Sequence, residues 1–310
     1  MIANMLTDLI GNTPMLRLNR LTAGLDVEIL AKLEMFNPYS LKDRPALYII
    51  EEAERSGQLA PGGTIVEASS GNAGTALTYI GRLKGYQVII CMSELMSDEH
   101  KQLMRALGAE LVLTPADSGI RGSREKAQEI AASLPNAIYT EQHHNPANAK
   151  SHRETTAEEI WRDTDGQVDI YIHGLGSCGT MTGVAQVLKD RKPSVRCIGL
   201  EPEGAALMSQ GEFKPHRLLG IGPGFVPALF DRDLMDDIVT VRVEDAFATC
   251  RQIAAEEGLM VGITSGASAF VALDLARQPE NAGKTIVIVF ADAGQAYMSV
   301  EGLFDTTGGT

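Results

Sequence analysis

Short apolar runs rich in β-branched residues alternate along this chain with longer segments whose apolar residues recur at helical spacing. The first of these runs predicts a strand over residues 27–33. The others predict buried strands over residues 65–66, 87–92, 110–114, 168–173, 195–200, 238–243 and 285–291. A helix is predicted from Asp43 to about Arg55, because Ala46, Ile49, Ile50 and Ala53 fall on one face. This alternation is typical of parallel sheets with crossover helices, an α/β fold.

Helix ends and connections give the predicted organisation of the chain. Ser97 is the expected N-cap of a helix that Gly108 ends. A length of 310 residues suggests two domains. The polar stretch EQHHNPANA, residues 141–149, is predicted to cross between them. We therefore expect a smaller, mobile domain over residues 45–147 and a larger one formed by residues 1–44 and 148–310.

Composition and charge narrow the function classes. A net charge of -13 argues against nucleic acid and anionic membranes as partners. No apolar run reaches the roughly 18 residues that a membrane span requires, and the N-terminus lacks the pattern of a signal peptide. Cys91, Cys178, Cys197 and Cys250 lie far apart, without metal spacing or a disulfide framework. We expect no metal site and a reducing cytoplasm as the setting.

One lysine stands at a predicted strand-to-helix junction. Lys42 lies in the stretch NPYSLKDR, residues 37–44, between the first predicted strand and the first predicted helix. A lysine amine is a useful nucleophile when its pKa is lowered or when it has condensed with a carbonyl. Alone, such a lysine is more often a solvated surface residue. Other loops in the chain favour the chemical interpretation.

The loop EASSGNAG, residues 67–74, follows a predicted strand and opens a predicted helix over residues 72–84. Its small hydroxyl and amide side chains would join the N–H groups of a helix N-terminus, which suits a carboxylate. A simple capping turn is the alternative.

A second glycine loop, GLGSCGTMTG at residues 174–183, has the same strand-loop-helix setting and suits a phosphate. It contains a G-x-G-x-x-G pattern at residues 174–179, and Glu201 loosely matches the acid expected about 20 residues later in dinucleotide folds. A nicotinamide-dependent dehydrogenase is therefore a distant alternative.

Two further segments are candidates for the site. In GITSG, residues 262–266, a hydroxyl at a strand end could contact a ring nitrogen; alternatively Ser265 or Ser268 only starts a helix that ends near Arg277. The connection over residues 211–227 is long and rich in Gly and Pro. Its end, GIGPGFVP at residues 220–227, mixes glycine with large apolar residues, which favours a functional loop over a linker.

The strings SLKDR, SSGNAG, GSCGT, GIGPGFVP and GITSGAS, in this order, resemble the cysteine synthase (O-acetylserine sulfhydrylase) branch of the pyridoxal 5'-phosphate (PLP) dependent β-family. The resemblance runs from about Leu6 to Leu303. It implies the tryptophan synthase β-like fold type II: two open, twisted, mostly parallel sheets flanked by helices, with PLP in the interdomain cleft. It also implies a homodimer.

The resemblance assigns roles to individual residues. Lys42 is similar to the lysine that forms the Schiff base with PLP, and Asn72 to the asparagine that binds the ring hydroxyl. Thr264 matches the hydroxyl residue at the pyridine nitrogen. The expected phosphate loop comprises Gly176, Ser177, Cys178, Gly179 and Thr180. The expected substrate-binding positions are Ser69, Ser70, Ala73, Gln142 and His143.

The implied reaction is β-replacement on an activated L-serine such as O-acetyl-L-serine. Lys42 would remove the α-proton, the β-substituent would leave to give an aminoacrylate, and a small nucleophile would add. A hydroxyl at the pyridine nitrogen favours prompt elimination over long-lived carbanion chemistry. A non-catalytic protein on the same fold is a further alternative, which the lysine and both anion loops disfavour.

Several positions depart from the family pattern. NPGGSVKDR becomes the shorter NPYSLKDR with Tyr39, TSGNTG becomes SSGNAG with Ala73, and the glutamine-phenylalanine pair becomes Gln142-His143. Cys178 replaces a glycine and Ala296 an arginine. Tolerated drift is one explanation. Our hypothesis is that β-replacement persists while the partner substrate has changed, either to O-phosphoserine as donor or to a non-sulfide nucleophile such as an amine, thiol or cyanide.

Overall fold

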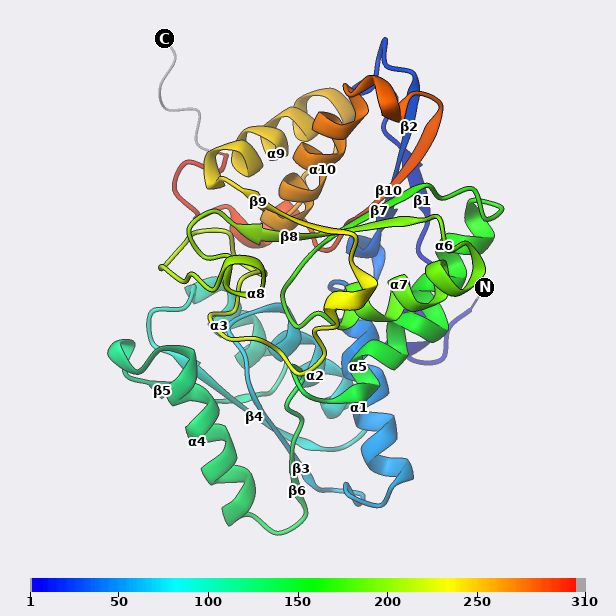
Figure 1. Cartoon of the computed structure of the whole chain (residues 1–310). Coiled ribbons are helices and arrows are strands. Elements are labelled where there is room, and N and C mark those ends of the chain that lie inside the picture. The colour runs from blue at the N-terminus through cyan, green and yellow to red at the C-terminus, as the bar shows by residue number, and fades with distance from the viewer. Residues whose placement is uncertain (1, 305–310) are drawn as a thin grey trace. The chain divides into compact units, whose positions relative to one another are not determined.

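The computed structural model describes residues 2–304, which form two compact units (Figure 1). Unit 1 comprises Met1–Ile10 and Asn37–Lys150, and unit 2 comprises Gly11–Phe36 and Ser151–Thr310. Unit 1 encloses the whole range predicted as a mobile domain and also contains Lys42. The division at residues 45 and 147 stays a prediction about which part moves.

Unit 1 is built on a parallel sheet in the order β5-β4-β3-β6. Helices α1, α2 and α3 cover one face, and α4 covers the other (Figure 1). On the first face, Ile65 and Ile90 pack with Ile50 and Leu77 in one buried cluster. The strands are β3 (Thr64–Ala68), β4 (Gln87–Ser93), β5 (Glu110–Thr114) and β6 (Ala137–Tyr139), and the helices are α1 (Asp43–Arg55), α2 (Asn72–Leu83), α3 (Asp98–Ala106), α4 (Gly119–Ser133) and α5 (Pro146–Ser151), whose last residue belongs to unit 2.

Unit 2 is built on a sheet in the order β1-β2-β10-β7-β8-β9, parallel except for β1. Helices α9 and α10 cover one face, while α6 and α7 lie on the other (Figure 1). The strands are β1 (Met15–Arg17), β2 (Val27–Leu33), β7 (Ile170–Gly174), β8 (Arg196–Pro202), β9 (Asp237–Val241) and β10 (Lys284–Phe290). The helices are α6 (Ala157–Asp163), α7 (Gly179–Arg191), α8 (Leu207–Gln210), α9 (Val243–Glu257) and α10 (Ile263–Ala276).

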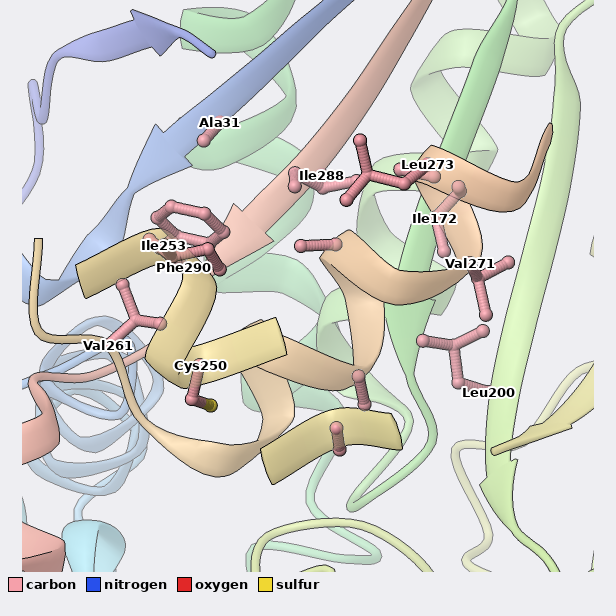
Figure 2. Close-up of a cluster of buried hydrophobic side chains, with 14 of the residues drawn as sticks. Ala31, Ile172, Leu200, Cys250, Ile253, Val261, Val271, Leu273, Ile288 and Phe290 are labelled. Atoms are coloured by element: carbon pink, nitrogen blue, oxygen red, sulfur yellow. The ribbon is translucent and has the colours of Figure 1, made fainter. Parts of the chain in front are cut away.

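The core of unit 2 lies between its sheet and the α9/α10 pair. Figure 2 shows Ile172, Ile288 and Phe290 from the strands facing Ile253 of α9 and Leu273 of α10. All of these side chains are buried. This large core fixes the sheet from which the glycine loops of unit 2 project.

The predicted strands and caps are mostly found, with corrections at the sheet edges. The β5 and β9 strands, predicted as buried, are half-exposed because each lies at the edge of its sheet. Strands β1 and β6 were missed because three residues carry too little pattern. Ser97 caps α3 as predicted, accepting a hydrogen bond from His100 N.

Within residues 2–304, no helix has both the length and the apolar character that crossing a membrane requires.

Candidate active site

Both sheets place predicted site segments at the point where the strand order reverses. In unit 1 the chain builds β3, β4 and β5 outward in one direction and then adds β6 on the other side of β3. Residues 69–72 follow β3, and Gln142-His143 follow β6, so both segments leave the carboxyl ends of adjacent strands. In open α/β sheets ligands bind at such switch points.

Lys42 is held by a tight turn at the start of α1. Its backbone N–H donates to Ser40 Oγ at 3.1 Å, and its carbonyl accepts the first helical bond from Ala46 N. The buried Asp43 carboxylate accepts the backbone N–H groups of Tyr39, at 2.8 Å, and Ser40. The Tyr39 ring packs on Tyr79 with centroids 5.0 Å apart. The shortened segment is thus a rigid turn, and Lys42 is half-buried within it.

The loop after β3 leads directly into α2, as predicted. Ser69 Oγ accepts the Gly74 N–H at 2.9 Å and so binds the first turn of α2, whose N-cap is Gly71. The same hydroxyl retains a proton that it can donate. Ser70 is exposed, and Asn72 begins the helix half-buried. The loop therefore combines hydroxyls with a helix N-terminus, an arrangement that suits a carboxylate.

Glu67 joins the two substrate segments of unit 1. Its carboxylate accepts the Ala68 N–H at 2.8 Å, the Gln142 N–H at 3.2 Å, and the Thr140 hydroxyl. The Gln142 carbonyl in turn accepts a bond from Asn148 Nδ2 at 2.8 Å. Burial raises the pKa of Glu67 to about 7, against the lowering effect of these hydrogen bonds. The sequence analysis assigned no role to Glu67. An acidic residue directly after the apolar residues of a buried strand was a signal that it binds buried donors.

His143 lies within electrostatic reach of Lys42. Burial lowers the pKa of His143 to about 3, and the positive charges of Lys42 and Arg124 add to the effect. The imidazole is therefore neutral near pH 7, with one nitrogen that donates a hydrogen bond and one that accepts. The structure thus brings together, within unit 1, the lysine, the carboxylate loop and the Gln142-His143 pair.

Glycines in unit 2 allow three predicted segments to pack against one another. A Cβ atom at Gly176 would lie 2.4 Å from the Gly220 carbonyl oxygen. A Cβ atom at Gly220, whose φ is +97°, would lie 2.9 Å from Thr264 Cγ2. The Gly222 N–H also donates to the Leu175 carbonyl. The glycine-rich connection, predicted to be functional, therefore closely contacts the predicted phosphate loop and the Thr264 segment.

The predicted phosphate loop joins β7 to the 13-residue helix α7. Strand β10 was added on the other side of β7 from β8, so this loop also lies at a switch point. Ser177 and Thr180 are buried, and Gly179 begins the helix. Cys178 adopts φ 65°, a left-handed conformation unusual for a residue with a side chain. Its Sγ lies 3.6 Å from Met208 Sδ.

Thr264 stands in the first turn of α10, which Gly262 caps and which ends at Ala276. The alternative in which Ser265 or Ser268 is the N-cap is wrong, because both lie inside the helix. Ser265 Oγ accepts the Ala291 N–H at 3.1 Å, and Ser268 Oγ donates to the Thr264 carbonyl at 3.0 Å. The two serines therefore secure α10, and Thr264 remains the candidate for the ring nitrogen.

The acid that suggested a dinucleotide fold has another function. Glu201 is fully buried, and its carboxylate accepts the Met208 N–H at 2.8 Å and the Ser209 N–H at 2.9 Å. It also accepts the Ser209 hydroxyl. Glu201 thus caps α8 instead of presenting its oxygens to a ribose, which removes the structural support for a dehydrogenase.

The residues present fit a phosphorylated aldehyde cofactor. The close approach at Gly176 leaves no room for a side chain there, so the donor groups of this loop are its backbone N–H groups and the Ser177 and Thr180 hydroxyls. These groups and the α7 N-terminus suit a phosphate. Within unit 1, Lys42 carries an amine, the group that condenses with an aldehyde. No group of acidic, cysteine or histidine side chains that could hold a metal ion occurs among residues 2–304.

Comparisons with known proteins agree with this arrangement. The model of the family described as pyridoxal-phosphate dependent enzyme matches residues 6–292. Cysteine synthase 3 of Caenorhabditis elegans is 42% identical over 95% of this chain and 88% of its own length. Cysteine synthase A of Escherichia coli K12 is 42% identical over 94% of this chain and 92% of its own length.

A comparison with solved structures also finds a similar enzyme. The crystal structure of O-ureido-L-serine synthase superposes with a TM-score of 0.96 and 40% identity, covering 100% of this chain and 98% of that one. The chain therefore has fold type II, with two open sheets that are each flanked by helices. The chain belongs to the pyridoxal-phosphate dependent enzymes and, within them, to the cysteine synthase-like enzymes that catalyse β-substitution.

Proposed function

We propose that this enzyme transfers the alanyl part of O-acetyl-L-serine to a small nucleophile, with Lys42 as the residue that binds PLP covalently. The observation that carries the proposal is the position of both anion loops. Each follows a strand at a switch point, the carboxylate loop in the unit of Lys42 and the phosphate loop in unit 2. Within unit 1, Ser69, Ser70 and Gln142 would bind the substrate carboxylate, next to Ala73 on α2.

The protein residues would divide the work as follows. PLP, when bound, supplies the electron sink that makes the substrate α-proton acidic. Asn72 would bind its ring hydroxyl and Thr264 its pyridine nitrogen. Lys42 Nζ would take the α-proton and return it after the nucleophile has added. The rigid turn formed by Asp43 fixes the backbone of Lys42, so only its side chain has to move between these tasks.

The nucleophile is the second part of the proposal. His143 places a neutral, polar imidazole near Lys42, at the position where the cysteine synthase pattern has an apolar ring. A nucleophile with carbonyl or N–H groups could hydrogen-bond there, whereas sulfide gains little. The similarity to O-ureido-L-serine synthase agrees with a ureido-type nucleophile. We therefore propose that this enzyme accepts polar nucleophiles in preference to sulfide.

Purified protein reconstituted with PLP tests both parts. We expect a visible absorption band that Lys42→Ala abolishes together with turnover. O-acetyl-L-serine and O-phospho-L-serine are then each offered with sulfide, hydroxyurea, methanethiol and cyanide. Loss of acetate without any nucleophile adduct, or turnover that survives Lys42→Ala, would refute β-replacement by this site.

His143→Phe separates the nucleophile proposal from the general one. This variant should lower kcat/KM for hydroxyurea by about tenfold or more, the value of one lost hydrogen bond to a desolvated polar group, and leave sulfide use nearly unchanged. Fast and selective sulfide use by the unaltered enzyme would overturn the polar-nucleophile proposal alone. A cytoplasmic homodimer remains our expectation, which size-exclusion chromatography with light scattering tests for the dimer.

A further inference from the structure

A buried histidine lies directly behind the phosphate loop. His152 opens a π-helical turn, η4 (His152–Thr156), that packs beside α7. Its side chain is fully buried, as is that of Thr156. His152 Nε2 lies 3.2 Å from Thr180 Oγ1, and His152 Nδ1 lies 2.9 Å from Thr156 Oγ1. The imidazole therefore bridges a helix hydroxyl and a hydroxyl of the phosphate loop.

The chemistry of these groups restricts where the protons are. A neutral imidazole has one N–H and one acceptor nitrogen, and each hydroxyl has one proton to donate. If Nε2 accepted from Thr180, the threonine would present only lone pairs to an anion. If Nε2 donates to Thr180 instead, Nδ1 accepts from Thr156 and the Thr180 proton is left to donate to the anion. A bound phosphate selects the second arrangement.

We propose that His152 is a positioning residue for the cofactor phosphate, which fixes the Thr180 hydroxyl as a donor through the chain Thr156 to His152 to Thr180. This inference rests on the proposed role of residues 176–180 as the phosphate loop. The helical turn contributes because residues 152 and 156, four apart, lie on one face of it, so the Thr156 hydroxyl reaches the His152 imidazole. π-Helical turns recur at functional sites.

Pyridoxine 5'-phosphate measures this contribution without the covalent bond to Lys42, because it has no aldehyde. Isothermal titration of the apoprotein should show about tenfold weaker binding for Thr156→Val, the effect of about 1.4 kcal/mol from one misdirected hydrogen bond. Thr156→Ser keeps the hydroxyl and should bind like the unaltered protein. His152→Gln, whose amide N–H can reach Thr180, should lose less affinity than His152→Leu.

A double-variant cycle distinguishes the proton chain from simple structural support. In the Thr180→Val background, Thr156→Val should have no further effect on affinity, because the hydroxyl that ends the hydrogen-bond chain has already been removed. The ¹⁵N shifts of His152 should show the proton on Nε2 in the complex. Pyridoxine, which lacks the phosphate, should bind all variants equally.

The outcomes separate this inference from the proposed function. If the unaltered protein bound neither PLP nor pyridoxine 5'-phosphate, the proposed phosphate loop itself would fail. If it bound both but Thr156→Val had no effect, or the same effect in the Thr180→Val background, the proton chain would be wrong and the proposed function would stand. A proton found on Nδ1 in the complex would also overturn it.

Discussion

Glu67 makes the stability of this protein depend on pH in a direction opposite to that of most carboxylates. Its ordinary pKa is 4.5, and burial raises the pKa in the folded chain to about 7. Between these values the folded protein holds a proton that the unfolded chain has released. The unfolding free energy should therefore fall as the pH rises from about 4.5 to about 7, and level off above that.

The magnitude follows from the shift. A change of about 2.5 pKa units at about 1.36 kcal/mol per unit gives about 3 kcal/mol for this single side chain. The side chain is fully buried in the sheet of unit 1, so solvent screening does not reduce the figure substantially. Glu67→Gln should lose this component because its amide does not titrate.

Urea unfolding of the apoprotein, followed by circular dichroism at pH 5 and pH 8, measures the effect. The difference in unfolding free energy between the unaltered protein and Glu67→Gln should shift by about 2.5 kcal/mol between the two pH values, because Glu67 of the unfolded chain is already largely ionised at pH 5. The unaltered protein should be relatively weaker at pH 8. Glu129→Gln, an exposed change on α4, is the matched control for replacing a carboxylate by an amide. A shift below about 0.5 kcal/mol for Glu67→Gln would refute the reasoning.

Three further changes follow from the geometry. Cys178→Gly should be more stable than Cys178→Ala by about 1 kcal/mol in thermal unfolding. At φ 65° a residue with a Cβ atom is strained, and this strain exceeds the entropy that glycine loses on folding. Equal stability of the two variants would contradict the strain. Gly176→Ala should weaken binding of PLP and pyridoxine 5'-phosphate at least tenfold by displacing the Gly220 carbonyl, as calorimetry would show. Asp43→Ala should destabilise the protein by about 1–2 kcal/mol and slow PLP attachment in a stopped-flow assay, whereas Asp43→Asn, which keeps an acceptor, should be milder.

The sequence predicted those parts of the fold that depend on local pattern. The bounds of β2 and α1 agree with the prediction, because a continuous apolar run and a periodic helix face are strong signals. The burial of β5 and β9 was misjudged because an edge position depends on strand order, which no local pattern records. The two strand-to-helix turns rich in glycine and small hydroxyl residues were also predicted, and they lead into α2 and α7 as expected; their role in binding anions stays a prediction.

The supporting residues of the site could not be predicted in the same way. Glu67 contacts Thr140 and Gln142, which lie more than 70 residues away along the chain. His152 reaches Thr180 across 28 positions. Each of these contacts is made only when a sheet or a helix pair brings distant segments together. A single sequence shows the polar residue but gives no partner for it.

Three buried carboxylates of this protein hold loops that lie next to the predicted site segments. Asp43, Glu67 and Glu201 each accept backbone N–H groups at a loop next to a site segment. They therefore hold the geometry of these loops. The proposed ligand-binding residues are hydroxyls, amides, a thiol and a neutral imidazole, and Lys42 alone carries a charge. We therefore propose that a phosphate and a carboxylate bind to backbone dipoles and neutral donors, and that Lys42 carries out the proton transfer.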